Sequence, residues 1–224
     1  MNNQISTALL IVIGTLGISS TSFAQDGFYV SGGLNNTTIE QGLTRNTGSN
    51  GPTTGPADGP SLSSSDRDTG AGIFLGLGYK WELDNDYFTA IEIFYADETA
   101  ETTNINNVLI SNFELDRSYG IDFRTGLSVT DRFGVYGLVG ATNYRFDSNL
   151  AYTFAPPTDF VEQDEWALVY GAGAEITLTD RITGFGEYRI STDVEFDTPR
   201  DKGGIVSDNE LDFGGLRTGI RYRF

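Results

Sequence analysis

The chain has 224 residues and a formal net charge of −17 at pH 7, and this acidity argues against nucleic acid as a partner, because contacts with phosphates need Lys and Arg. It contains no Cys and no His, which excludes disulfides, thiolate chemistry and the commonest general base and metal ligand. Only 38% of the residues are hydrophobic, whereas 28 Gly, 15 Phe and 11 Tyr indicate a strand-rich protein of one domain.

The first residues are typical of an export signal. The apolar run at 8–18 is too short to cross a bilayer as a helix, and Ser22 and Ala24 place small residues at the −3 and −1 positions of a cleavage site. No Lys or Arg precedes the run, so only the α-amino group supplies positive charge there. We therefore predict a cleaved signal peptide at 1–24 and a mature domain at 25–224. A buried helix is less favoured, because nothing amphipathic follows the run.

From residue 26 onward, hydrophobic residues alternate with a period of two, which predicts β-strands. In the second predicted strand, Ile73, Leu75 and Leu77 share one face, while Lys80 and several Gly occupy the other. The same separation recurs along the chain. Eight strands are predicted, at residues 27–34, 69–81, 87–97, 118–129, 132–144, 166–178, 182–191 and 215–224.

The two faces of the fifth predicted strand are hard to tell apart by polarity, and an internal repeat settles them. "LSVTDRFGVYG" at 127–137 parallels "ITLTDRITGFG" at 176–186, and each copy crosses a Thr-Asp-Arg turn between two strands. Aligning the copies places Val135 and Val139 on the apolar face.

The connections alternate in length. Short turns are predicted near 82–86, 130–131 and 179–180, and long loops near 35–68, 98–112, 147–164 and 195–208. An eight-stranded antiparallel up-and-down barrel would carry all the short turns at one rim and all the long loops at the other. Transmembrane β-barrels have this asymmetry, with short periplasmic turns and long extracellular loops.

Period two alone does not decide which face points outward. In a soluble, lipocalin-like barrel the apolar face would surround a ligand, and in a membrane barrel it would contact lipid. Gly crowds the charged face, as a narrow interior requires, and aromatic residues recur near strand ends, as at membrane interfaces. We therefore favour an all-β transmembrane barrel. The predicted interface aromatics are Tyr79, Trp81, Tyr87, Tyr119 and Trp166.

The last strand carries a further motif. Arg217, Gly219, Tyr222 and Phe224 follow the pattern of polar residue, Gly, aromatic residue and terminal aromatic residue. This pattern resembles the C-terminal assembly signal of bacterial outer-membrane proteins. Together with eight strands and a signal peptide, the chain resembles the small outer-membrane barrels that include the OmpA transmembrane domain, OmpX and the opacity proteins.

The resemblance implies a place in the cell outer membrane of a Gram-negative bacterium. It implies outer-membrane lipid and lipopolysaccharide as surroundings, and the barrel assembly machinery as a partner during biogenesis. We expect a monomer without a cofactor. Relatives on this scaffold also include adhesins, channels and enzymes.

With the apolar face of each strand towards the lipid, the charged side chains of the strands point into the barrel. Since an eight-stranded barrel leaves an interior that side chains can fill, we predict an ion-pair plug with no continuous pore. A switchable salt bridge that gates a narrow channel is the alternative. The plug is predicted to be centred on Glu92, Glu187, Arg189 and Arg217. Its mid-depth members are Glu92, Asp122, Arg124, Glu187, Arg189 and Arg217.

Catalysis is not expected, because the outer-membrane enzymes that resemble this chain rely on His. Carboxylates such as Glu162, Asp164 and Glu165 could act as acid and base, yet on a loop they more often form a solvated surface. The acidic residues near the long loops, Asp97 and Glu98 among them, are expected to surround the outer mouth. They could bind Ca²⁺ or Mg²⁺, or contact a host or phage, but solvation is preferred.

The predicted function is therefore a structural membrane barrel or an adhesin-like surface scaffold. A porin-like channel for small solutes and a soluble binder of apolar ligands remain the alternatives.

Overall fold

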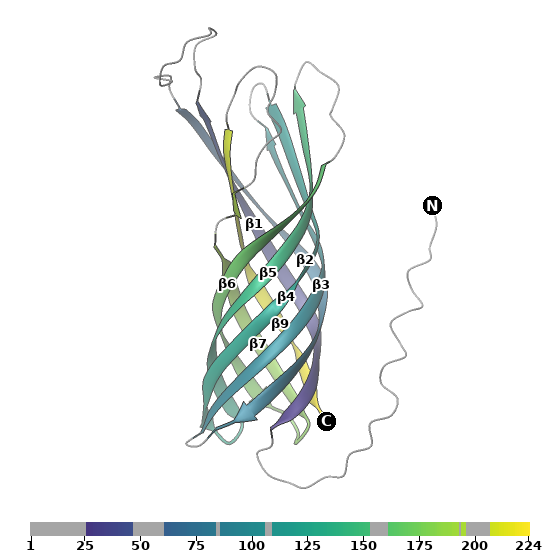
Figure 1. Ribbon diagram of the computed structural model, residues 1–224, viewed down its shortest axis with the longest axis vertical. Coiled ribbons are helices and arrows are strands. Elements are labelled where there is room, and N and C mark those ends of the chain that lie inside the picture. The colour runs from purple at the N-terminus through teal and green to yellow at the C-terminus, as the bar shows by residue number, and fades with distance from the viewer. Residues whose placement is uncertain are drawn as a thin grey trace, which may run out of the picture.

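The computed structural model in Figure 1 describes residues 26–46, 61–83, 86–105, 109–152, 161–192, 194–195 and 207–224. The predicted signal peptide lies outside these residues. Among them, no helix is long and apolar enough to cross a membrane. The strands are β1 (Gly27–Asn46), β2 (Ser61–Glu82), β3 (Tyr87–Ile105), β4 (Leu109–Thr130), β5 (Phe133–Tyr152), β6 (Val161–Thr177), β7 (Ile182–Ser191), β8 (Val194–Glu195) and β9 (Ser207–Arg223).

The strands form one closed antiparallel sheet. Each strand from β1 to β6 pairs with the next, β7 pairs with β9, and β9 pairs back with β1. β8 has two residues and only adds to the edge of β9. Eight strands, β1 to β7 and β9, therefore close the barrel, and the predicted all-β up-and-down architecture is confirmed.

The short turns gather at one rim, which is the lower rim in Figure 1, where the C-terminus also lies. In the two Thr-Asp-Arg turns a threonine side chain organises the backbone. The Oγ1 of Thr130 accepts hydrogen bonds from the amides of Arg132 and Phe133 (3.3 and 3.0 Å), and Thr179 does the same for the corresponding residues (3.3 and 3.1 Å). The sequence repeat thus encodes the same side-chain-capped turn twice.

An apolar band surrounds the half of the barrel next to this rim. On β3 it runs from Tyr87 to Tyr95, with Ile91 and Ile93 between them, and these outward side chains are exposed. A strand of about 9–11 tilted residues crosses a membrane, which matches the height of this band. Val135 and Val139 belong to it, as the repeat predicts.

Most strands are longer than predicted. Residues at both ends of the predicted long loops belong to paired strands, so the predicted loop boundaries are wrong. For example, within the loop predicted at 35–68, β1 continues to Asn46 and β2 begins at Ser61. The residues between the strand ends, at 47–60, 106–108, 153–160 and 196–206, lie outside the described part of the chain. Only β7 ends as predicted, at Ser191. We call the strand portions beyond the apolar band the extension, which forms the upper half of the barrel in Figure 1.

The polarity of the two faces inverts in the extension. Its outer face carries charged residues such as Asp97, Arg117 and Arg145, whereas its interior is filled by side chains that are almost completely buried. We call the inner group the apolar cap. It comprises Ile39, Ala100, Leu115, Tyr144, Phe146, Ala167, Val194, Leu211 and Phe213. The extension therefore has the apolar core of a soluble protein, and the band below it has the apolar exterior of a membrane protein.

Candidate functional site

The barrel interior holds most of the buried polar groups of the described residues. Its buried charged side chains are five carboxylates and four guanidiniums, and partly buried Lys80 supplies a fifth positive charge. Glu82, with a similar exposure, forms an ion pair with the same Lys80, so carboxylates outnumber cations by one. The carboxylates are Glu92, Glu98, Asp122, Glu175 and Glu187, and the guanidiniums are Arg124, Arg189, Arg217 and Arg221.

Arg124 on β4 is the centre of this interior network and is 1% exposed. Its Nη2 donates to Glu92 Oε1 at 3.1 Å, to Asp122 Oδ2 at 3.2 Å and to Glu187 Oε1 at 3.1 Å. Its Nε donates to Glu187 Oε2, also at 3.1 Å. One guanidinium thus links carboxylates from β3, β4 and β7 across the width of the barrel, in the fork geometry for which Arg is suited.

Arg189 on β7 forms the second strong contact. Its Nη1 and Nη2 donate to the two oxygens of Asp122 at 2.6 and 2.9 Å, a bidentate pair, and Nη1 also reaches Glu187 at 3.1 Å. Asp122 therefore accepts hydrogen bonds from two guanidiniums. With both partners in place its charge is neutralised, as a buried carboxylate requires.

Arg217 on β9 is held differently. Its Nη1 lies 3.8 Å from Asp122 Oδ2, too far for a hydrogen bond, and its guanidinium lies over the rings of Phe74 and Phe94 at 4.6 and 4.2 Å from their centres. Its Nε and Nη1 have no hydrogen-bond partner among the described residues. Aromatic faces thus supply much of the contact of this cation.

A polar layer lies below, towards the short turns. Arg221 donates to Glu175 at 3.0 Å and to the hydroxyl of Tyr136 at 3.3 Å, and that hydroxyl donates to Glu187 at 3.0 Å. Lys80 donates to Glu175 at 2.8 Å. This layer therefore continues the charge network from mid-depth towards the rim.

The structure brings all six predicted mid-depth residues together, and we refer to them as the ion cluster. It does not place Glu92, Glu187, Arg189 and Arg217 at the centre, because Arg124 makes the contacts that connect the carboxylates. The sequence could not reveal this, since strand tilt and register decide which interior residues meet across a barrel.

Two glycines explain how the charged groups fit. A Cβ on Gly76 would overlap the Ser31 hydroxyl and approach the carboxylate of Glu92, and a Cβ on Gly140 would overlap an oxygen of Asp122. Both glycines adjoin the ion cluster, so the space that a side chain would fill is taken by its carboxylates. The crowding of Gly on the charged face is therefore a packing requirement.

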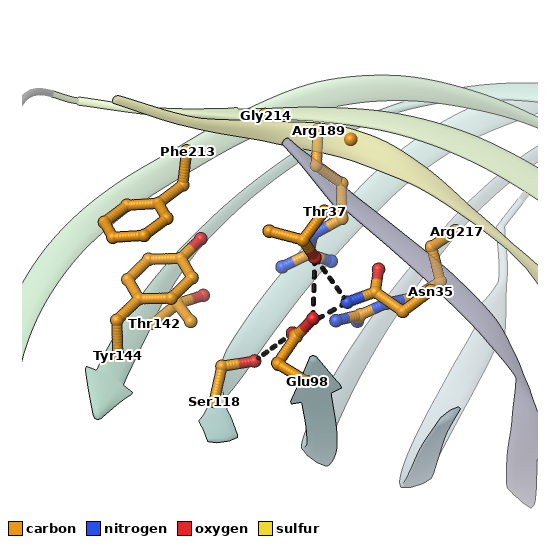
Figure 2. Close-up of a pocket in the computed structure, with 11 residues that line it drawn as sticks. Asn35, Thr37, Glu98, Ser118, Thr142, Tyr144, Arg189, Phe213, Gly214 and Arg217 are labelled. Carbon is orange, nitrogen blue, oxygen red and sulfur yellow. Dashed lines mark hydrogen bonds between the residues drawn. The ribbon is translucent and has the colours of Figure 1, made fainter. Parts of the chain in front are cut away.

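Above the ion cluster lies a polar cavity of about 20 Å³, room for about one water molecule (Figure 2). Glu98 of β3 points into it and accepts hydrogen bonds from Asn35 (2.7 Å), Thr37 (2.7 Å) and Ser118 (2.8 Å). The prediction that Glu98 lies on an acidic loop is wrong: it is 5% exposed inside the barrel. The sequence did not reveal its three neutral donors, because they lie on the strands β1 and β4, far from Glu98 along the chain or outside its own strand.

The apolar cap closes the cavity on the other side. Tyr144 and Phe213 stack face to face with ring centres 4.1 Å apart, and Figure 2 shows this pair beside the polar group. Behind them, Leu115 and Phe146 are 0% and 2% exposed. Two layers therefore fill the interior along the barrel axis: the ion cluster, and above it the apolar cap.

The predicted C-terminal signal residues occupy both faces of β9. Tyr222 and Phe224 lie on the outside, with their rings 5.5 Å apart and edge to face, whereas Arg217 lies in the ion cluster. A Cβ on Gly219 would overlap the carbonyl of Gly32 on β1, so this position needs Gly at the closing seam. The Phe224 amide donates to the carbonyl of Phe28 at 3.1 Å, which pairs the last residue with the first strand.

The predicted interface aromatics lie at the two ends of the apolar band. Tyr79, Trp81 and Tyr87 are near the short turns. Tyr119 and Trp166 lie at the other end of the band and contact each other edge to face at 5.8 Å.

Residues suggested for catalysis or metal binding form other contacts. Glu162 forms an ion pair with Arg145, and Asp164 lies 4.0 Å from the same guanidinium, on the outer face. Within the described ranges, no three carboxylates gather as a metal site would require. Glu162 and Asp164 therefore face the same cation on the outer wall.

Comparison with known proteins gives a family. The family described as outer membrane protein beta-barrel domain matches residues 8–224. No curated protein sequence matches the chain. Similar solved structures include Ail, the attachment invasion locus protein of Yersinia pestis, at 15% identity over 88% of this chain and 99% of that one, with a TM-score of 0.38.

Two further structures are similar to the chain. The outer membrane protein OprG of Pseudomonas aeruginosa has 13% identity over 89% of this chain and 95% of that one, with a TM-score of 0.44. The outer membrane protease OmpT of Escherichia coli has 10% identity over 92% and 99%, with a TM-score of 0.47.

Proposed function

Because the chain belongs to the outer membrane protein β-barrel family and is located in the cell outer membrane, we propose that it is a closed, non-conducting barrel that carries a rigid extension above the membrane. In this orientation the short turns are periplasmic and the extension is extracellular. The soluble, lipocalin-like alternative is excluded by the family.

The observation that carries the proposal is the double closure of the interior. The ion cluster fills the barrel within the apolar band, and the apolar cap fills it within the extension. A hydrated ion that crossed the barrel would have to displace paired charges first and then pass through a dry core, and both steps cost free energy. Either barrier alone should therefore keep the barrel closed.

The extension supports a surface role. Its strands continue well past the band and enclose a packed core. Binding elements work best when a rigid framework positions them. We therefore propose a surface-interaction scaffold without enzymatic activity, whose ligand would contact the outer end.

The remaining motifs fit biogenesis as a monomer. We propose that a cleaved signal at 1–24 directs export and that the barrel assembly machinery recognises the last strand through Tyr222 and Phe224, which lie exposed on its outer face. The aromatic residues at the ends of the band would then anchor the barrel at the two interfaces.

Liposome swelling tests the closed state. The refolded mature chain is incorporated into liposomes and exposed to a small sugar, with a general porin as the positive control, and heat-modifiable gel migration verifies folding. We expect no swelling above that of empty liposomes. Swelling comparable to that of the porin would make this protein a small-solute channel instead.

A further inference from the structure

The cavity between the ion cluster and the apolar cap is lined by charges of both signs. The carboxylate of Glu98 and the guanidiniums of Arg189 and Arg217 all line it, and Figure 2 shows these side chains converging on it. An anion in the cavity would be repelled by the carboxylate, and a cation by the two guanidiniums. Its volume of about 20 Å³ holds one water molecule. The cavity is therefore suited to a neutral ligand of that size.

Two side chains that line the cavity carry polar atoms without a hydrogen-bond partner among the described residues. They are Arg217 on β9, through Nε and Nη1, and Thr142 on β5, through Oγ1. The two residues are 2% and 1% exposed, so bulk solvent does not reach these atoms. Buried polar groups nearly always have a partner, because an unmade hydrogen bond costs the full desolvation of the group. One ligand in the cavity would contact both side chains.

Glu98 supplies an acceptor to the same cavity. It follows Asp97, the last residue of β3 that pairs with β2, and the register between β3 and β4 shifts directly after Asp97. Irregularities of this kind often aim a side chain at a site. Oε1 accepts two hydrogen bonds, from Asn35 and Ser118, whereas Oε2 accepts one, from Thr37. Since a carboxylate has about four lone-pair positions, Oε2 can accept one hydrogen bond more.

We propose that the cavity is a binding site for one water molecule that joins Arg217 to Glu98. The water accepts a hydrogen bond from the Arg217 guanidinium and donates one to Oε2 of Glu98, and the Thr142 hydroxyl makes its third hydrogen bond. Three hydrogen bonds are typical of a buried water, and such a bridge is enthalpically nearly as favourable as a direct bond. Arg217, which lies over two aromatic rings within the ion cluster, thereby gains a carboxylate partner above the cluster.

This water connects two parts of the molecule through the interior. Arg217 belongs to the ion cluster within the apolar band, whereas Glu98 is held by side chains of β1 and β4 at the base of the extension. The bridge therefore ties the membrane-spanning part to the extension in addition to the backbone ladder. The tie is independent of whether the barrel conducts ions.

A crystal structure of the refolded chain tests the site directly, at a resolution that shows ordered water and with bromide in place of chloride in the crystallisation solution. We expect one peak in the cavity within about 3.2 Å of an Arg217 nitrogen, Thr142 Oγ1 and Glu98 Oε2, without a bromide anomalous signal. A bromide signal at this position would assign the cavity to an anion and overturn the proposal. A cavity without a peak, in a map that shows other interior waters, would overturn it as well.

Thr142→Val tests the same site by urea unfolding in lipid vesicles. Val has nearly the same shape as Thr but lacks the hydroxyl, so the unfolding midpoint should fall because the water loses one of its three partners. Removal of a hydroxyl that had no partner would leave the midpoint unchanged or raise it, and this result would contradict the proposal. The matched control is Thr218→Val on the exposed outer face of β9, which should not lower the midpoint.

Thr142→Ser separates the role of the hydroxyl from that of the methyl group. Ser keeps the hydroxyl, so the water peak should persist in the crystal structure of this variant, whereas it should weaken or vanish in that of Thr142→Val. A peak of equal strength in the Val variant would show that Thr142 does not hold the water, and the proposed site would be wrong.

Discussion

Arg124 on β4 and Glu187 on β7, which are 63 residues apart, are joined by two hydrogen bonds of 3.1 Å in the centre of the barrel. Both side chains are 1% exposed. The contact connects the two halves of the sheet through the interior, which the backbone ladder cannot do. Loss of this contact should therefore lower the stability of the barrel.

Glu187→Ala should lower the free energy of unfolding by about 3–5 kcal/mol, because it removes a buried carboxylate that accepts hydrogen bonds from Arg124, Arg189 and Tyr136 and leaves the buried guanidiniums with excess positive charge. Urea unfolding in lipid vesicles measures this effect. The matched control is Asp131→Ala, a carboxylate exposed on a short turn, which should stay within about 0.5 kcal/mol of wild type. Equal effects from the two substitutions would contradict the assigned role of the ion cluster.

Gly76→Ala and Gly140→Ala should each destabilise the barrel by about 1–3 kcal/mol, because their methyl groups would overlap groups beside the ion cluster. Gly137 is the control. A Cβ there would come no closer than 3.9 Å to the Gly171 carbonyl oxygen, so Ala should be tolerated. The same urea titration distinguishes the two cases, and a stable Gly76→Ala variant would show that the interior is looser than described.

The upper boundary of the apolar band can be located with a single charge. Ile93→Arg places a cation on the lipid face and should cost about 2–4 kcal/mol. Glu101→Arg, on the outer face of the extension of the same strand, should cost about 0.5 kcal/mol or less. Comparable losses at both positions would place the extension inside the membrane and contradict the inverted polarity.

The apolar cap should behave as a soluble core. Leu115→Ala removes a side chain that is 0% exposed and should cost about 2–5 kcal/mol, and it should speed proteolysis of the extension. Leu216→Ala, on the lipid-facing outside of β9, is the comparison and should leave proteolysis unchanged. Unaltered proteolysis of both variants would mean that Leu115 is not part of a packed core.

Much of the barrel could be predicted because one physical rule holds along the band. Alternation with a period of two assigns each residue to a face, and the internal repeat places Val135 correctly where polarity alone was ambiguous. The charged interior follows from the same alternation, since lipid cannot surround charges.

The extension was missed because its polarity is inverted. Ile39, Leu115 and Phe146 alternate with polar residues as strongly as residues in the band do, yet they point inward. Scattered apolar residues among Asp, Glu and Ser are typical of loops as well as of strands with one solvated face. The alternation of Tyr144 and Phe146 with Arg145 and Asp147 was the signal that could have extended β5.

The partners within the interior could not be predicted from the sequence. A face assignment places Arg124 inside the barrel, but it did not extend to Glu98, which lies beyond the predicted strand, and strand tilt and stagger decide which interior residues meet. Glu98 therefore joined three neutral donors rather than the outer surface.

Single-channel conductance in a planar bilayer tests the double closure most directly. Four refolded proteins are compared: wild type, Arg124→Ala with Glu187→Ala, Phe146→Ala with Phe213→Ala, and the combination of all four substitutions. Heat-modifiable gel migration verifies that each has folded. We predict silence from wild type and from both double variants, since either barrier alone closes the barrel, and current only from the combination. Steady current through wild type would contradict the account.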